Sequence, residues 1–198
     1  YRTAIAIAAR AVVEQGRAFD GCAFVATGAT FADALSAAPL STAFGRPLYL
    51  CGPTGLSVST IAAMHDVGVT DVVILGGTGA VPSGVEEQLS GAGINNDRVQ
   101  GATRYATAIE VARLGVSEGL SWDHLALANG TSFADALSGG IMQGHSCSVM
   151  LLTSSTSLDP IVEAELAAQA DFISEIRYLG GLAAVSQSVR DAASGVLR

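Results

Sequence analysis

The chain contains the same six-residue stretch twice, and this repeat limits the folds that it can adopt. Phe-Ala-Asp-Ala-Leu-Ser begins at Phe31 and again at Phe133. Other landmarks return in the same order, since Leu75-Gly76-Gly77 recurs as Leu179-Gly180-Gly181. The distance between copies changes slightly along the chain, as expected when loops differ in length between equivalent elements. The chain is therefore a duplicated module of roughly 100 residues, which is close to the usual domain size.

The repeat also predicts where the modules divide. We expect the first module to cover residues 1–97 and the second to cover residues 98–198. The first copy opens at Tyr1, inside a motif that stands complete in the second copy from Arg104 to Ala108. We therefore expect this sequence to be a fragment of a longer protein.

Hydrophobic spacing within each module predicts alternating helices and strands. Ile5, Ala8 and Val12 lie on one side of an amphipathic helix, which Ile109, Ala112 and Val116 repeat. Short unbroken apolar runs predict strands that are buried on both faces, as in a parallel sheet. These runs are residues 22–26, 48–50 and 72–75 in the first module and 125–128, 149–152 and 176–179 in the second.

The stretches between these strands are long enough for crossover helices. They cover residues 31–44, 57–67, 133–143 and 159–169. Alternating strands and helices favour an open sheet with right-handed crossovers. The fold class that we predict is α/β, as two tandem small Rossmann-like modules, each with a parallel sheet flanked by helices.

The repeated six residues have a local explanation. Thr30-x-x-Asp33 and Ser132-x-x-Asp135 each fit a capping box directly after a strand, in which the hydroxyl caps the helix and the carboxylate reaches back. Gly28 and Gly130 would supply the turn from strand to helix. Two interpretations stay open for the motif: a device of folding only, or part of a functional surface.

Charge and composition exclude several classes of function. Ten basic residues against 18 acidic ones give a net charge of −8, which disfavours nucleic-acid binding because that requires a basic surface. The sequence has no apolar run long enough to span a membrane. An apolar fraction of 49% with 14% charged residues indicates that neighbouring modules or subunits cover some nonpolar surface. We interpret Cys22, Cys51 and Cys147 as small buried residues, and we expect neither a metal site nor a cofactor.

Nucleotide binding and catalysis find little support. Gly76-Gly77-Thr78-Gly79 follows a strand, but Pro82 stands where a dinucleotide fingerprint has its last glycine, and the chain has no lysine for a phosphate loop. The familiar nucleophile and metalloprotease motifs are missing as well. An enzyme is therefore disfavoured, although two carboxylates facing one cleft would reopen that interpretation.

A recurring set of polar residues and glycines remains without a catalytic role. Arginine binds carboxylates through two parallel hydrogen bonds, so we expect Arg104 to pair with an aspartate of the repeated motif in its own or a neighbouring module. The candidate residues for a binding site or a module interface are Arg98, Arg104, Tyr105, Asp33, Asp135, Gly28, Gly130, Gly76 and Gly180.

These motifs together resemble a known family. "RVQGATRYATA" from Arg98, "ALANGTSFADALSGG" from Ala126 and "YLGGLAAVSQSV" from Tyr178 are similar to the cell wall binding repeat 2 family. The first module carries the same resemblance in "ATGATFADALSAAPL" and "VVILGGTGAVPSGV". The resemblance covers nearly the whole chain, as two tandem copies.

The resemblance implies a function and a setting. It implies an extracellular module of the cell wall or surface layer, which holds an attached domain noncovalently through an anionic secondary wall polymer. It also implies that three α/β repeats pack around a pseudo-threefold axis, whereas this chain shows two. We therefore expect a third module or a homo-oligomer as partner, with Arg198 at the possible opening of a third copy. The alternative is a structural module that mediates assembly or protein contacts at the cell surface.

Overall fold

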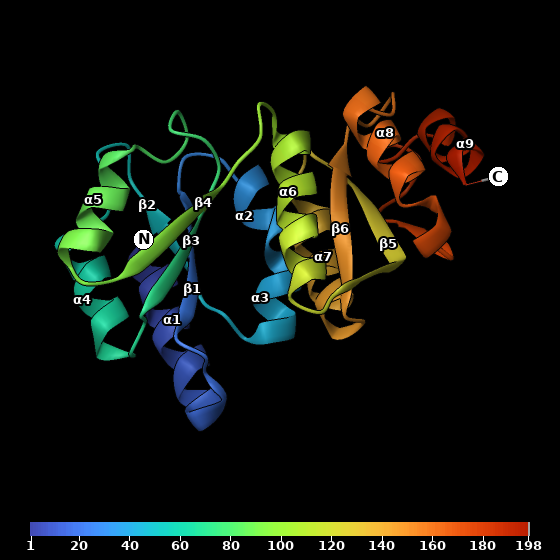
Figure 1. Cartoon of the computed structure of the whole chain (residues 1–198). Helices are drawn as coiled ribbons and strands as arrows, with labels where there is room; N and C mark the ends of the chain where they lie inside the picture. The colour runs from blue at the N-terminus through green and yellow to red at the C-terminus, as the bar shows by residue number, and fades with distance from the viewer. Residues whose placement is uncertain (198) are drawn as a thin grey trace.

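Two parallel β-sheets lie side by side with helices around them (Figure 1). The structure is a computed structural model that describes residues 1–197, without the side chain of residue 17. The predicted α/β class is confirmed. Each half of the chain alternates strands and helices, and all neighbouring strands of both sheets are parallel.

The first sheet has the strand order β2-β1-β3-β4. Its strands are β1 (Cys22–Thr27), β2 (Leu48–Cys51), β3 (Asp71–Leu75) and β4 (Asn95–Val99). The helices of this half are α1 (Arg2–Gln15), α2 (Ala32–Ser36), α3 (Ala38–Phe44), α4 (Val58–Asp66) and α5 (Gly84–Gly91), with a 3-10 turn η1 (Gly16–Ala18).

The second sheet has the order β6-β5-β7 within the described residues. Its strands are β5 (Ser121–Asn129), β6 (Ser148–Thr153) and β7 (Glu175–Tyr178). The helices are α6 (Arg104–Ser117), α7 (Ala134–His145), α8 (Pro160–Ala168) and α9 (Gln187–Val196), with a 3-10 turn η2 (Ala170–Phe172).

Strand β4 lies across the expected division between residues 97 and 98. All five of its residues pair with β3, so the strand that carries Arg98 completes the first sheet. The division of the chain at that point stays a prediction. The polar sequence Asn-Asn-Asp-Arg-Val does not resemble a buried strand, which is why hydrophobic patterning did not predict β4.

The expected helix over residues 31–44 is interrupted, although its repeat over residues 133–143 is not. Helix α2 ends at Ser36 and α3 begins at Ala38, whereas α7 continues without a break. Pro39 stands where α7 has Ile141. Proline has no N–H for a helical hydrogen bond, and its ring clashes with the preceding turn, so the first copy breaks there.

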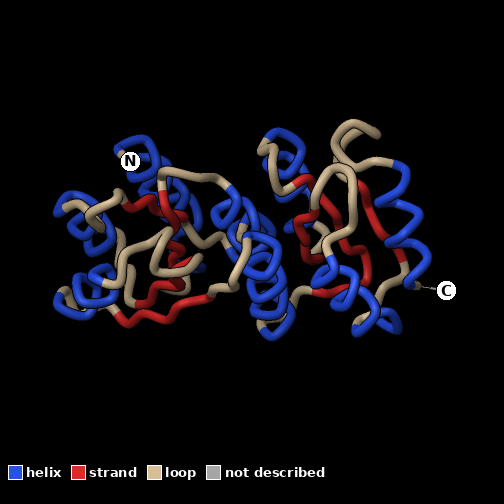
Figure 2. The backbone as a smooth tube through the Cα atoms, turned by 90° about the horizontal axis from the view of Figure 1, so that it is seen from above, coloured by secondary structure: helices blue, strands red, loops and turns tan. Residues whose placement is uncertain are grey.

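Helices α2, α3, α6 and α7 lie between the two sheets, as both views show (Figures 1 and 2). Helices α3 and α7 approach closely because α7 has glycines where they meet. A Cβ atom on Gly140 would come within 2.5 Å of the Ala38 Cβ atom, and one on Gly144 within 2.6 Å of the Pro39 carbonyl oxygen. The two modules are therefore joined through backbone contact.

A continuous hydrophobic core crosses this junction. Phe24 and Leu40 from the first module belong to the same cluster as Ile109, Leu127 and Leu151 from the second. The rings of Phe31 and Phe133, which are the first residues of the repeated stretch, meet edge to face with centroids 5.8 Å apart. The chain thus contains a strongly paired set of modules.

Two further expectations can be compared with the structure. Cys51 is buried and Cys22 is partly buried, but Cys147 is exposed, so the interpretation as a buried residue is wrong for Cys147. Its φ of 50° places it in the turn that follows α7. Among residues 1–197 no helix has the length and apolarity needed to cross a membrane.

Candidate functional site

The repeated motifs gather at the carboxyl ends of the strands, where open parallel sheets usually bind ligands. The strand-to-helix turns there do not form the capping boxes that we expected, and different side chains make their hydrogen bonds. Helices α2 and α7 begin at Ala32 and Ala134, and neither has a side-chain cap. Instead Thr27 Oγ1 accepts a hydrogen bond from the Ala29 N–H, and Asn129 Oδ1 accepts one from the Thr131 N–H. The last residue of each strand closes its turn, so the capping role predicted for Thr30 and Ser132 is wrong.

Gly28 and Gly130 lie under tyrosine rings. A Cβ atom on Gly28 would lie 2.6 Å from a ring carbon of Tyr1, and one on Gly130 would lie 2.8 Å from a ring carbon of Tyr105. Both glycines have ordinary negative φ angles, so close approach explains them better than backbone freedom does. The tyrosine and the glycine recur together because one packs on the other.

Gly76 and Gly180 lie against the carboxylates of the repeated motif. Their φ angles are 98° and 97°, a region that favours glycine. A Cβ atom on Gly76 would lie 2.5 Å from an oxygen of Asp33, and one on Gly180 would collide with Asp135. The structure therefore brings each predicted aspartate together with the predicted glycine of its own module.

Three guanidinium groups bind carbonyl groups of these glycine turns. Arg98 Nη1 donates to the Gly76 carbonyl at 2.7 Å, and Arg104 Nη1 donates to the Gly130 carbonyl at 2.6 Å. Arg190 Nη2 donates to the Gly180 carbonyl at 2.9 Å. Arg190 and Glu86 occupy equivalent positions in the two modules, after Val189 and Val85 respectively. Because these two residues differ, the repeat did not predict a role for Arg190.

Arg98 lies inside its module. Its side chain is only 9% exposed, and its Nε atom donates to Glu86 Oε1 at 2.7 Å. This hydrogen bond is the main cause that lowers the pKa of Glu86. Arg98 Nη2 and Glu86 Oε2 are buried without a hydrogen-bond partner in the described residues. Because its charge is both buried and neutralised, Arg98 has no free face toward a ligand.

A polar cavity of about 320 Å³ lies where the two modules meet. It contains Asp33 from the first module and Arg104 from the second. The other lining residues come from the glycine turn after β3, the start of α2 and the first turns of α6: Thr30, Ala32, Gly77, Gly79, Ala80, Gly101, Ala102, Thr103 and Thr107. Neither module supplies this site alone.

Asp33 is the titratable group with a perturbed pKa in this cavity. Burial raises the pKa of its carboxyl group, and the nearby charge of Arg104 acts in the opposite direction. Within the described chain Arg104 forms no ion pair, so the direct arginine–aspartate pair that we expected is not made. The ion pair that does link the modules joins Arg46 Nη1 to Glu118 Oε2 at 2.5 Å, and Arg46 also bonds Asp20 at 2.8 Å. Arg46 does not recur in the second module, so the repeat gave no signal for it.

The chemistry of the cavity suits binding better than bond cleavage. It offers one guanidinium group, one carboxylate, the exposed hydroxyls of Thr30 and Thr103, and the glycine backbone of a turn. These groups donate and accept hydrogen bonds in several directions, as the hydroxyl groups of a sugar require. Among residues 1–197 no group of His, Cys, Asp and Glu side chains is arranged to hold a metal ion.

Comparisons with known proteins place these features in context. The family model described as Cell wall binding domain 2 (CWB2) matches residues 1–86 and residues 98–190. N-acetylmuramoyl-L-alanine amidase LytC of Bacillus subtilis (strain 168) is 30% identical over 168 residues, which cover 84% of this chain and 32% of that protein. Amidase enhancer of the same strain is 25% identical over 169 residues, which cover 85% of this chain and 22% of that protein. The chain thus spans a third or less of these curated relatives.

Two solved structures have the same fold. Cwp6 from Clostridium difficile superposes with a TM-score of 0.84 at 24% identity, over 98% of this chain and 30% of that chain. Cwp8 from Clostridium difficile superposes with a TM-score of 0.79 at 24% identity, over 98% of this chain and 32% of that chain. At this level of identity the likeness concerns the arrangement of helices and strands.

Proposed function

This chain belongs to the Cell wall binding domain 2 family, and we propose that it holds a secreted or surface protein on the cell wall by noncovalent binding of an anionic secondary wall polymer. The observation that carries the choice of site is the polar cavity between the modules, which combines Asp33, Arg104 and the exposed hydroxyls of Thr30 and Thr103. The proposed role is binding only. The amidase activity in the name of LytC belongs to that whole protein, which is about three times as long as the segment that matches this chain.

The residues of the predicted set take different parts in this proposal. Arg104 is the cation nearest the cavity and would contact the anionic groups of the polymer, with Asp33 accepting hydrogen bonds from sugar hydroxyls. Tyr105 and the glycines Gly28, Gly130, Gly76 and Gly180 fix the turns around them. Arg98 would act inside its module, and Asp135 would act in a second cavity that needs a further module to complete it.

The overall charge of −8 does not exclude an anionic ligand. Exposed single charges contribute only about 0.2–1 kcal/mol each, and salt screens repulsion beyond ~10 Å. A repetitive polymer meets several weak sites on one protein, so their effects combine as avidity. Local arginines therefore decide binding more than net charge does.

The partner that completes the assembly would be a third module or a second copy of the chain. Phe133 directly before α7 and Leu137 and Ile141 on it are exposed, whereas the first-module counterpart of Leu137, Leu35, is buried in a cluster with residues of the second module. Helix α1 exposes Ile7, whereas its counterpart Val111 on α6 is buried. Each of the two faces that meet at the junction thus has an equivalent on the other module, and both of these equivalent faces are exposed.

These apolar faces also favour the second candidate function, a module that mediates assembly at the cell surface without contacting a polymer. The two functions differ in what the chain binds on isolated walls. A polymer-binding module loses its ligand when mild acid strips the secondary polymer, whereas an assembly module does not.

Cosedimentation of the chain with isolated Gram-positive cell walls, before and after acid stripping, tests the proposal. We expect retention on intact walls, loss after stripping, and a reduction of about fivefold or more in affinity for Arg104→Ala, which removes a charge-assisted contact. The matched control is Arg10→Ala, because Arg10 is exposed on α1 and pairs with Glu14 outside the cavity. Unchanged retention on stripped walls would favour the assembly function, and equal binding by both variants would remove Arg104 from the site.

A further inference from the structure

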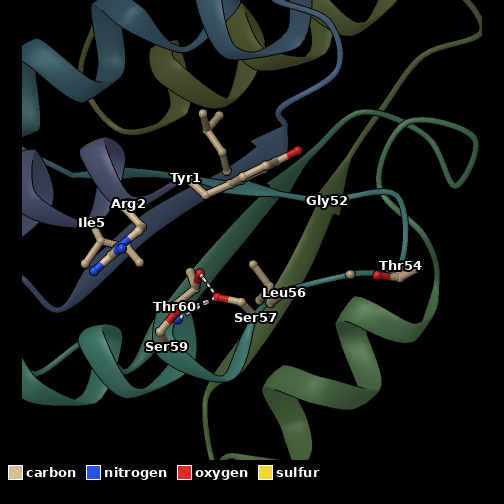
Figure 3. Close-up of a pocket in the computed structure, with 11 residues that line it drawn as sticks. Tyr1, Arg2, Ile5, Gly52, Thr54, Leu56, Ser57, Ser59 and Thr60 are labelled. Atoms are coloured by element: carbon tan, nitrogen blue, oxygen red, sulfur yellow. Dashed lines mark hydrogen bonds between the residues drawn. The ribbon is translucent and has the colours of Figure 1, made fainter.

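Another cavity, which belongs to the first module alone, lies at the same edge of the first sheet, away from the junction (Figure 3). Its volume is about 360 Å³, within the range of small-molecule sites. One wall is the start of α1, with Tyr1, Arg2 and Ile5, and the opposite wall is the start of α4, with Ser57 and Thr60. Leu50, Leu56 and the loop from Gly52 to Gly55 complete it.

Three of the hydroxyls that line this cavity form a hydrogen-bonded set. Ser57 Oγ lies 2.8 Å from Ser59 Oγ and 2.8 Å from Thr60 Oγ1, and it caps α4 by accepting the Thr60 N–H at 3.1 Å (Figure 3). Ser57 and Ser59 are exposed, so their hydroxyls can also bond a ligand. Clustered hydroxyls that both donate and accept suit the hydroxyl groups of a sugar.

An aromatic ring lies on the wall of the cavity opposite these hydroxyls. Tyr1 is 53% exposed, with its ring edge packed on Gly28. The contact with Gly28 holds the ring in place, and an amphipathic ring of this kind offers an apolar surface to a sugar ring and a phenolic hydroxyl to its rim. Tyr1 would therefore serve as a platform for one sugar unit.

The charge in the cavity is positive, although the chain is acidic. Arg2 is the charged side chain among the lining residues, and none of them is Asp or Glu. Within the part of the chain that the structure describes, Arg2 makes no ion pair, whereas Arg10 on the same helix pairs with Glu14 at 2.8 Å. An unpaired guanidinium group in a sugar-sized cavity favours an anionic substituent on the sugar.

The second module lacks these groups at the equivalent positions. Ala106 stands for Arg2, and the start of α8 has Asp159, Ile161 and Val162 where the start of α4 has Ser57, Ser59 and Thr60. The fold therefore does not require the hydroxyls or the arginine. Ser57 caps α4 as Asp159 caps α8, so the feature particular to the first module is an Arg2 unpaired within the described residues, in one cavity with exposed hydroxyls, which points to a ligand that this module contacts.

We propose that this cavity, formed by Tyr1, Arg2, Ser57, Ser59 and Thr60, binds an anionic sugar residue, as a glycan subsite separate from the junction cavity. The inference rests on the proposed function, since it assigns a further contact to a charged wall glycan. The shared chemistry is a sugar ring with a negative substituent, which is either a carboxylate or a phosphate.

The test is an NMR titration of the ¹⁵N-labelled chain with its α-amino group acetylated, so that Arg2 supplies the only positive charge in the cavity. The probes are trigalacturonate for the carboxylate, N-acetylglucosamine 1-phosphate for the phosphate, and neutral maltotriose. We expect the amide signals of Arg2, Thr54 and residues 57–60 to shift with one or both anionic probes, at an affinity about fivefold or more above that for maltotriose. Which anionic probe binds more tightly identifies the substituent.

Variants separate charge from stacking. Arg2→Ala should lower the affinity for the anionic probe about fivefold or more, whereas the charge-matched control Arg10→Ala should leave it within about twofold. Tyr1→Leu should weaken every probe that binds. Shifts that map elsewhere, an unchanged affinity in Arg2→Ala, or binding by neither anionic probe would overturn the subsite.

Wall cosedimentation of the same protein distinguishes this failure from that of the proposed function. Retention on walls without any probe binding would overturn the subsite and leave wall anchoring in place. Probe binding at Arg2 without retention on walls would support the subsite and contradict wall anchoring.

Discussion

Asp33 is a repeated residue whose carboxylate lies in the junction cavity without a hydrogen-bond donor in the described structure. Within that cavity the carboxylate lies beside Gly76. Burial raises the pKa of this group, so the folded protein binds a proton there more tightly than the unfolded chain does. The contribution of Asp33 to stability therefore falls as the pH rises through its folded pKa.

Replacing Asp33 by Asn should consequently stabilise the protein at neutral pH. We expect the free energy of unfolding to rise by about 0.5–1 kcal/mol at pH 7, because the variant removes a partly buried charge without removing a hydrogen bond. The gain should shrink toward zero as the pH falls to the usual aspartate pKa of 3.8 and below. There Asp33 becomes protonated in both the folded and the unfolded state, so the parent protein carries no charge that the variant lacks. Urea titrations between pH 3.5 and pH 7 measure it.

The control for this prediction is Asp171→Asn, at an exposed position in η2. Its free energy of unfolding should stay within about 0.5 kcal/mol of the parent at every pH. A loss of stability in Asp33→Asn at pH 7 would mean that the attraction to Arg104 outweighs burial, and Asp33 would then be a structural residue.

At the residue scale the sequence could show what recurs and little else. The pairs of Tyr with Gly28 or Gly130 and of Asp with Gly76 or Gly180 recur, and each pair meets in space. Arg46 and Arg190 bind important partners but occur in one module only, so a repeat analysis could not select them. The partner of Arg104 was also not predictable, because it is the backbone carbonyl of Gly130 and not a side chain.

Helices α3 and α7 join the modules at the scale of elements. Small residues allow the close approach, since Gly140 faces Ala38 and Gly144 faces Thr42 and the Pro39 carbonyl. A backbone carbonyl cannot rotate away as a flexible side chain does. The backbone of α3 therefore leaves no room for a side chain at Gly144.

Gly144→Ala should separate these helices and destabilise the protein. An added methyl group would come 2.6 Å from the Pro39 oxygen, so we expect the free energy of unfolding to fall by about 1–3 kcal/mol, as for overpacked cores. The matched control is Gly195→Ala in α9, where, among residues 1–197 and apart from the helix's own backbone and the chain neighbours, no atom lies within 4 Å of the added group. That change should leave the stability unchanged or raise it by up to about 0.5 kcal/mol, since alanine favours a helix over glycine but Gly195 lies in the last turn.

Denaturant titrations of both variants decide between packing and helix propensity. A stabilised Gly144→Ala protein would show that the helices can move apart without loss, and the junction would then be looser than the structure indicates. A loss of stability in Gly144→Ala without one in Gly195→Ala would confirm that the close approach is a requirement of the fold.

Elements with strong hydrophobic signals were predictable, and elements with polar sequences were not. The six apolar runs all form strands, and the four expected crossover regions all contain helices. Strand β4 escaped prediction because it is an edge strand with few apolar residues, and its pairing with β3 is the evidence for it. Helices α5 and α9 were not predicted, and most of their residues are polar or glycine, so neither presents a clear apolar signal.

At the scale of the whole molecule, the junction shows how two module faces fit and leaves one of each kind unpaired. The α1 face contains Ile7, which is 64% exposed, and the α7 face contains Leu137, which is 52% exposed. Their counterparts Val111 and Leu35 are buried against each other's modules. The faces differ from one another, so contact between chains through them would be heterologous, from head to tail.

The chain alone should therefore self-associate in a concentration-dependent way through these two faces. We expect sedimentation velocity to show larger species as concentration rises, and Ile7→Glu or Leu137→Glu each to leave a monomer, because a charge at the centre of an apolar contact is costly. The control is Val58→Glu, which places the same charge at an exposed position on α4 outside both faces. A compact monomer at all concentrations would contradict self-association and leave a separate third module as the candidate partner.

Mixing the two variants tests the head-to-tail geometry itself. The Ile7→Glu chain retains an intact α7 face, and the Leu137→Glu chain retains an intact α1 face. An equimolar mixture should therefore form a one-to-one dimer that cannot grow further, because its remaining faces carry the charges. If the contact instead joined two identical faces, one of the two variants would still dimerise alone, and mixing would add nothing.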